Sequence, residues 1–248
     1  MAPPVTTRAD FMARIRREMA AAPASASATP MERPARPAAI ADTIRRELAE
    51  RWLQTLGRFR EEFERVGGVF HRVSRLADVP DLVAGLARER QATRLVTWHP
   101  TALGADLGDA LSAHGLATTA MPPGPLDGAA RDHLRRVIAE ADLGLTGVDL
   151  AIAETGSLVL LSGAGRPRST SLLPPCHVAV FDRSVLVESL TQAGVFLEAW
   201  NGDGRPAWRG GAINFITGPS RTADIELTLT RGVHGPKEVH AVFVDTRG

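Results

Sequence analysis

The sequence predicts an α/β fold in layers, with a largely parallel sheet at its centre. From about residue 69 onward, short apolar runs of the length of buried strands alternate with amphipathic segments of the length of helices. The chain has 248 residues, which is enough for one substantial core and an accessory helix. We therefore expect one main α/β domain over residues 39–248, preceded by N-terminal helical sequence.

Residues 1–38 are expected to form a helix and a flexible linker. A four-residue apolar interval predicts a short amphipathic helix over residues 8–20. Residues 21–37 are rich in Ala, Pro and Ser, which is typical of a linker. The helix is either a partly ordered tail or a docking element for a partner or a second subunit. The residues at the four-residue interval are Phe11, Ile15 and Met19.

A longer helix is predicted over residues 39–66, where apolar residues recur every three or four positions and form one stripe. Gly67 and Gly68 end this helix. The stripe could pack against the domain or against a second copy, so a homo-oligomer is one possibility. Its members are Ile44, Leu48, Trp52, Leu56, Phe59, Phe63 and Val66.

The remaining elements follow from the alternation of apolar and amphipathic segments. We expect strands at residues 69–73, 94–98, 116–121, 145–153, 157–162, 177–181, 212–217 and 239–244. We expect helices at residues 79–89, 101–113, 129–140 and 184–200. The two strands flanking Glu154-Thr155-Gly156 are close enough in sequence to form an antiparallel excursion from the sheet.

The composition excludes several classes of function. The formal net charge is +1, so the chain lacks a broad electrostatic footprint for nucleic acid or an anionic membrane. No apolar run approaches the roughly 18 residues of a membrane span, and no secretory signal is recognisable, so we expect a cytoplasmic protein. Lys237 is the single lysine and tyrosine is absent, which excludes a P-loop lysine and a Tyr/Lys dehydrogenase site.

Cys176 is the single cysteine, so an internal disulfide and an all-cysteine cluster are excluded within one chain. We expect this thiol to be buried and inert. His71, His99 and His114 lack metal-type spacing, and we interpret them as unrelated to chemistry. No cofactor and no metal site is expected in this chain.

The first candidate site is the run from Ile213 to Glu226, in which an apolar strand stops at Gly218-Pro219 and becomes polar. Such strand ends often carry ligand sites in α/β sheets. If a helical turn starts there, its amides and an arginine would favour an anion; the alternative is ordinary capping and pairing. His234, in the nearby turn Gly232–Pro236, is placed to face the same pocket. The candidate ligand-binding residues are Ser220, Arg221, Thr222, Asp224, Glu226 and His234.

The second candidate is Glu154-Thr155-Gly156-Ser157, a turn between two apolar strands. A partly desolvated carboxylate there could act as a base or a nucleophile. The alternative is a turn carboxylate that caps backbone amides. Under the first interpretation Glu154 is catalytic, and Thr155, Gly156 and Ser157 bind the ligand.

The third candidate is the loop Gly163–Ser171, whose arginines and hydroxyls suit a phosphate or a carboxylate, with Arg168 and Ser171 as ligand-binding residues. The alternative is a mobile, solvated hairpin loop. The third glycine of a dinucleotide fingerprint is missing, which excludes a Rossmann site. His177 follows Pro174-Pro175 at the start of a strand, where it either titrates or binds ligand near neutral pH or serves as a hydrogen-bonded structural residue.

The motifs Ala153–Ser157, Ser171–Pro174, Ile213–Glu226 and Gly232–Pro236 occur in this order along the chain. Together they resemble the lactate-utilisation protein C family, whose defining module is the LUD domain. The resemblance covers roughly residues 40–248, and the N-terminal helix is similar to that family's leader. It implies a fold similar to sugar-phosphate isomerases and coenzyme A transferases, and a role in bacterial oxidation of L-lactate to pyruvate. Two further proteins would carry iron–sulfur clusters as partners.

Three hypotheses for function follow. In the first, the chain is a subunit of a lactate-oxidising complex that binds a small carboxylate through Arg221 and moves protons through Glu154 or His177. In the second, it is a free-standing coenzyme A transferase-like or sugar-phosphate isomerase-like enzyme, with Glu154 as nucleophile or base. In the third, it is a non-catalytic scaffold whose N-terminal helix carries the function.

Overall fold

The computed structural model describes residues 7–21, 35–201, 209–223 and 229–246. Its contacts divide the chain into two units, residues 1–35 and 36–248. The first unit contains helix α1 (Arg8–Ala21), as the apolar interval predicts. Its Phe11, Met12 and Ile15 side chains are exposed. Most of the expected linker, residues 22–34, lies outside the described residues.

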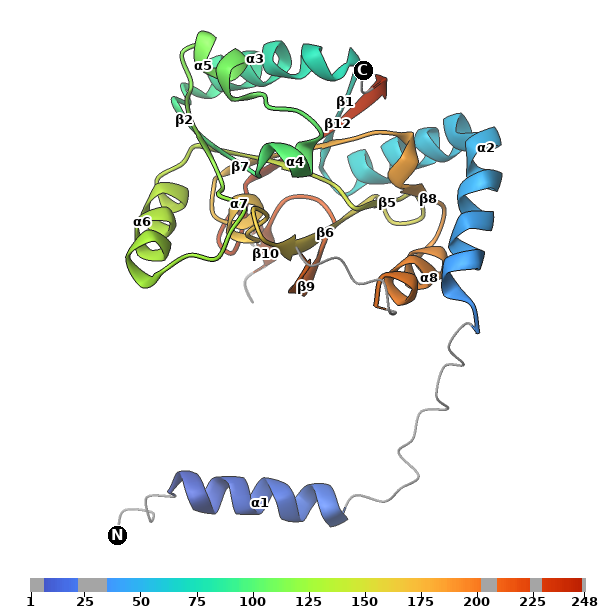
Figure 1. The fold of residues 1–248 in the computed structure, drawn as a ribbon, viewed down its shortest axis with the longest axis vertical. Coiled ribbons are helices and arrows are strands. Elements are labelled where there is room, and N and C mark those ends of the chain that lie inside the picture. Colours follow the sequence, from blue (N-terminus) through green and yellow to red (C-terminus); the bar gives the residue numbers. More distant parts are fainter. Residues whose placement is uncertain (1–6, 22–34, 202–208, 224–228, 247–248) are drawn as a thin grey trace. The chain divides into compact units, whose positions relative to one another are not determined.

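The second unit is built on a six-stranded sheet in which all five neighbouring pairs of strands are parallel (Figure 1). This confirms the predicted layered α/β class with a mostly parallel sheet. In spatial order the strands are β1 (Val69–Arg75), β12 (Glu238–Thr246), β7 (Cys176–Phe181), β4 (Leu143–Gly147), β2 (Arg94–Thr97) and β3 (Ala117–Ala120).

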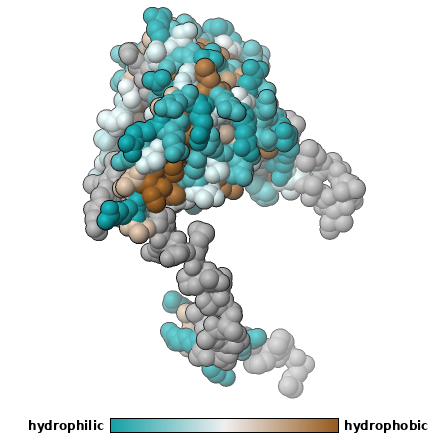
Figure 2. All heavy atoms as spheres, turned by 90° about the vertical axis from the view of Figure 1, so that its right-hand side faces the viewer, coloured by the Kyte–Doolittle hydropathy of each residue, from teal (hydrophilic) through white to brown (hydrophobic). Residues whose placement is uncertain are grey.

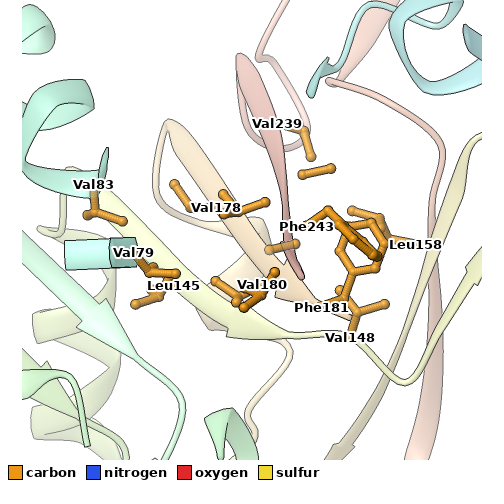
Figure 3. Close-up of a cluster of buried hydrophobic side chains, with 14 of the residues drawn as sticks. Val79, Val83, Leu145, Val148, Leu158, Val178, Val180, Phe181, Val239 and Phe243 are labelled. Atoms are coloured by element: carbon orange, nitrogen blue, oxygen red, sulfur yellow. The ribbon is translucent and has the colours of Figure 1, made fainter. Parts of the chain in front are cut away.

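The register of this sheet assigns its side chains to two faces. His177 lies level with Gly144 on one side and Val239 on the other, so these three residues share a face. Cys176 and its partner Glu238 point to the opposite face. Figure 3 shows Val79 and Val83 of α3 (Val79–Arg90) on one side of the core, and Phe181, Phe243 and Leu158 on the other.

A second, four-stranded sheet has the order β8 (Leu186–Val187), β5 (Leu150–Ile152), β6 (Ser157–Gly163) and β9 (Arg209–Ile216). The pairing of β5 with β6 is antiparallel, which confirms the predicted excursion. A two-stranded antiparallel ribbon follows, formed by β10 (Arg221–Ala223) and β11 (Leu229–Arg231).

The long helix α2 (Pro37–Arg65) matches its prediction, with a kink at Arg51. The Arg51 guanidinium binds both carboxylate oxygens of Glu188, at 2.7 and 2.9 Å. Phe59 is fully buried, and the centroid of its ring lies 5.3 Å from the centroid of the Phe181 ring. The apolar stripe therefore packs within its own unit, and Figure 2, which faces the side that carries α2, shows a mostly hydrophilic outer surface with small apolar patches.

Three predicted elements are wrong in detail. The strand expected at 145–153 is two strands in two sheets, because the Asp149 carboxylate between them accepts a hydrogen bond from the backbone N–H of Leu161 at 2.7 Å. The helix expected at 101–113 is divided into α4 (Pro100–Leu103) and α5 (Gly108–Ala113) by Gly104, whose φ is +81°.

The helix expected at 184–200 begins late. A short 3₁₀ turn at Arg183–Val185 and strand β8 come first, because the carbonyl of Val187 accepts the backbone N–H of Ala153 at 2.8 Å. Helix α8 then covers Leu190–Asn201. The other helices are α6 (Gly128–Ala139), α7 (Ser169–Leu172) and the 3₁₀ turn η2 (Leu76–Asp78). None of the helices in the described ranges is long and apolar enough to span a membrane.

Candidate functional site

Two of the motif glycines let loops approach the last turn of α2. Gly156 has a φ of +59°, and a Cβ there would collide with the backbone at Glu62 and Phe63. Gly218 has a φ of +80°, and its Cβ would lie 2.5 Å from the carbonyl oxygen of Val66. Both positions therefore require glycine for close packing and for backbone conformation, whatever ligand the loops bind.

Glu154 lies in the predicted turn, but it is exposed rather than partly desolvated. Its Oε2 accepts a hydrogen bond from the backbone N–H of Leu190, the first residue of α8, at 2.9 Å. A carboxylate at a helix N-terminus stabilises that helix. The structure thus supports the capping interpretation of Glu154.

The neighbouring hydroxyls form a short chain that ties the β5–β6 turn to the end of β9. Thr155 Oγ1 donates to Ser157 Oγ at 2.7 Å, and Ser157 Oγ lies 2.7 Å from Thr217 Oγ1. Ser157 is buried, so its hydroxyl is used in holding the turn. These contacts fix the loop, and they leave Thr155 half-buried.

The polar segment after Gly218 forms a strand, β10, instead of the helical turn that would favour an anion. Ser220 joins it to the second glycine-rich turn: its carbonyl accepts from the N–H of Gly232 at 3.0 Å, and its Oγ accepts from the N–H of His234 at 3.3 Å. The side chains of Arg221 and His234 are exposed, whereas Thr222 is half-buried. Asp224 and Glu226 lie outside the described residues.

The Gly163–Ser171 loop is anchored at several points, which contradicts a freely solvated hairpin. Arg166 is buried over the Trp98 ring, with its guanidinium 4.6 Å from the ring centroid and 3.0 Å from the Asp149 carboxylate. Ser171 is buried and its Oγ donates to the carbonyl of Arg168 at 2.9 Å, whereas the Arg168 side chain is exposed.

Beside this loop a cavity of about 210 Å³ opens near the carboxyl ends of β2 and β3. Met121 directly follows β3, and the N–H of His99, which follows β2, donates to the Gly165 carbonyl at 2.9 Å. This edge is where α/β sheets usually bind ligands. The cavity is lined by the loop, by Ser169 and by two arginines of α6, Arg131 and Arg135. Sequence patterns did not single out these arginines, because they look like ordinary exposed helix residues.

His177 is buried in the sheet, with Nε2 2.9 Å from Thr146 Oγ1. Burial, with a smaller effect of His240, lowers the pKa of His177 to about 3. The ring is therefore neutral at neutral pH, which supports the structural interpretation. Among the described residues no hydrogen bond or ion pair joins Glu154, His177 and Arg221 to one another.

A second group of polar side chains lies at the amino ends of β7 and β12, on the face covered by α3. Cys176, Glu238 and His240 place one ligand atom each within 4.8 Å of the others. The pKa of the Cys176 thiol is raised to about 12, chiefly by burial, so the free thiol is protonated at neutral pH. His71, interpreted from sequence as unrelated to chemistry, has Nε2 2.9 Å from His240 Nδ1. The sequence signal for this group is the Glu238-x-His240 spacing in β12, because residues two apart in a strand lie on the same face.

Comparisons with known proteins assign the class of this chain. Residues 56–244 match the LUD domain family, and the chain belongs to this family. It is 44% identical over 108 residues to "Lactate utilization protein C" of Shouchella clausii, covering 43% of this chain and 45% of that protein. It is 44% identical over 110 residues to "Lactate utilization protein C" of Halalkalibacterium halodurans, covering 44% and 46%.

The chain thus spans about half the length of the curated relatives it matches. Among solved structures, the crystal structure of a DUF162 family protein from Deinococcus radiodurans is similar at 23% identity and a TM-score of 0.49, covering 77% of this chain and 97% of that one.

Proposed function

We propose that the chain is a cytoplasmic subunit of a bacterial system that oxidises L-lactate to pyruvate, acting with iron–sulfur partner proteins. The observation that carries this proposal is membership of the LUD domain family together with relatives named lactate utilization protein C. The chain has one cysteine, and that thiol is buried. It offers no set of thiolates for an iron–sulfur cluster, so the electrons pass through partner proteins.

The cavity beside α6 is the best-placed site for a small carboxylate in this role. Arg131 and Arg135 bring two guanidinium groups, which suit carboxylate recognition. Met121, Leu134 and Ile138 supply an apolar wall for a short aliphatic tail. Such a lining matches the chemistry of a small 2-hydroxy or 2-keto acid.

A growth experiment tests the role in lactate use. Deletion of the gene is expected to abolish growth on L-lactate while leaving growth on glucose intact, and the wild-type gene should restore it. Normal growth of the deletion strain, in the absence of a second copy, would contradict the proposal.

Variants of α6 test the cavity. The double variant Arg131→Gln with Arg135→Gln should fail to restore growth, whereas Arg136→Gln, on the same helix but outside the cavity lining, should restore it. Full complementation by the double variant would show that the cavity is not needed.

Partners are tested by purifying the tagged protein from cells grown on L-lactate. Iron–sulfur proteins and lactate-oxidising activity are expected in the eluate. An iron-free single protein without activity would contradict the assembly with iron–sulfur partners.

A non-catalytic scaffold is the second candidate, favoured by one observation: the exposed Phe11, Met12 and Ile15 of α1. Removal of residues 1–35 would then abolish growth on L-lactate, while the α6 double variant would still support it. The transferase alternative has less support, because Glu154 is engaged in capping α8.

A further inference from the structure

We propose that Cys176, Glu238 and His240 form a binding site for a zinc-type divalent metal ion at the amino-terminal ends of the strands of the six-stranded sheet, which is the main sheet of the domain. This site is separate from the cavity beside α6, which lies at the carboxyl edge. It also departs from the expectation, drawn from histidine spacing, that the chain has no metal site.

The backbone places the three donors together. Glu238 and His240 are two residues apart in β12 and therefore share a face of the sheet. Cys176 is the register partner of Glu238 in the neighbouring strand β7. The three ligand atoms lie within 4.8 Å of one another, and donors around a tetrahedral zinc ion stand about 3.4 to 3.8 Å apart. The 4.8 Å separation is an upper limit, so binding requires the donors to move closer together by at most about 1.4 Å.

The donor set selects the class of metal. One sulfur, one imidazole nitrogen and one carboxylate oxygen suit zinc and similar transition metals, whereas magnesium and calcium prefer oxygen ligands throughout. Three protein donors leave the fourth position of a tetrahedron to water. The Glu238 side chain is 43% exposed, so an ion can reach the buried thiol and imidazole from the side of this carboxylate.

His71 supplies the outer support that metal-binding histidines usually have. Its Nε2 lies 2.9 Å from His240 Nδ1, and the two rings are stacked with centroids 5.2 Å apart. If His240 donates its Nδ1 proton to His71, the lone pair on His240 Nε2 faces Glu238, at 3.3 Å from its Oε2. A ligating histidine is typically oriented by such a bond from its other nitrogen.

Arg90 determines how tightly the ion is held. Its guanidinium pairs with Glu238 and lies 3.4 Å from His240 Nε2, so it occupies the position of a cation beside these donors. Metal binding displaces it from this position and releases the Cys176 proton to solvent, because the sulfur binds the ion as a thiolate. The carbonyl of Leu86 and the carboxylate of Glu89, at 2.9 and 3.1 Å from Arg90 Nη1, keep the displaced side chain hydrogen-bonded.

The experiment titrates the full chain, freed of metal with a chelator, with Co²⁺ and then Zn²⁺. We expect one equivalent of Co²⁺, a thiolate-to-cobalt charge-transfer band, and loss of that band when Zn²⁺ is added. Cys176→Ser should remove the band, and Glu238→Gln should weaken binding. His71→Phe should weaken binding about 10- to 100-fold, as is usual for outer-shell partners.

Arg90→Met should tighten Co²⁺ binding by about tenfold or more, because it removes a competing cation. A misfolded variant would bind more weakly, so this gain in affinity cannot be caused by misfolding. His133→Ala, an exposed change on α6, is the matched control and should leave binding unchanged. The proposal is overturned if folded wild-type protein binds less than one equivalent, if Cys176→Ser keeps the band, or if Arg90→Met fails to tighten binding.

Discussion

Replacing His177 by glutamine should remove a defined part of the pH dependence of stability. The native ring has a pKa of about 3 because of burial, compared with 6.5 for the ordinary side chain. Between these two values the unfolded chain binds a proton that the native protein does not. Wild-type stability therefore falls as the pH is lowered through this window, and the variant lacks this contribution.

As long as the native ring stays neutral, the size of this loss of stability depends only on the ordinary pKa of 6.5 of the unfolded histidine. At pH 5 the unfolded histidine is about 1.5 pH units below its own pKa, and each unit corresponds to about 1.36 kcal/mol, giving about 2 kcal/mol relative to pH 8. The assay is urea unfolding of both proteins at pH 8 and pH 5. The loss between these pH values should be about 2 kcal/mol larger in the wild type than in His177→Gln.

Thr146→Val is the matched control, because it removes the hydrogen-bond partner of the ring but keeps the imidazole. This variant should be less stable at both pH values, by about 1 kcal/mol, and should keep the wild-type pH dependence. Equal pH dependence in the wild type and His177→Gln would refute the conclusion that burial holds this ring neutral.

Three further predictions concern packing, and all are checked by urea unfolding with circular dichroism. Gly156→Ala should destabilise the protein by more than about 1 kcal/mol because its Cβ meets the α2 backbone. Gly194→Ala, in open space on α8, is the control and should be neutral or stabilising. Equal effects of the two substitutions would contradict the predicted clash at Gly156. Asp149→Asn should cost about 3–5 kcal/mol by removing the carboxylate that pairs with the buried Arg166 guanidinium. Asp132→Asn, in an exposed pair, should cost less than about 1 kcal/mol. Phe59→Ala should cost about 3–5 kcal/mol, and a loss below 1 kcal/mol would mean that this buried ring is not central to the core.

Periodicity predicted the parts of the fold in which local sequence and tertiary structure agree. The stripe from Ile44 to Phe63 is buried as one face of α2, and the apolar run of β7 is fully buried as parallel strands usually are. The break at Asp149 was not predictable, because its partners, the Leu161 amide and the Arg166 guanidinium, become neighbours only when the chain is folded.

The candidate sites were also hard to predict wherever they depend on segments that become neighbours only when the chain is folded. Glycines beside polar residues suggested binding loops, but Gly156 and Gly218 are explained by the nearby backbone of α2, which no local pattern reveals. The group around His240 was missed because Cys176 and His71 reach it only through the strand order, with β12 between β7 and β1. Residues from three separate segments meet there, and the sequence states neither their order nor their register.

The same strand order constrains how the protein is made on the ribosome. Of the strands in the main sheet, β12 is synthesised last, yet it lies between β1 and β7. Until it emerges, β1 has no partner in this sheet, and the edge of β7 that β12 will cover stays open. Unpaired strand edges attract other chains. The nascent protein therefore passes through a stage in which two edges need shielding, and nonsense mutations upstream of Glu238 should yield aggregating fragments instead of smaller folded domains.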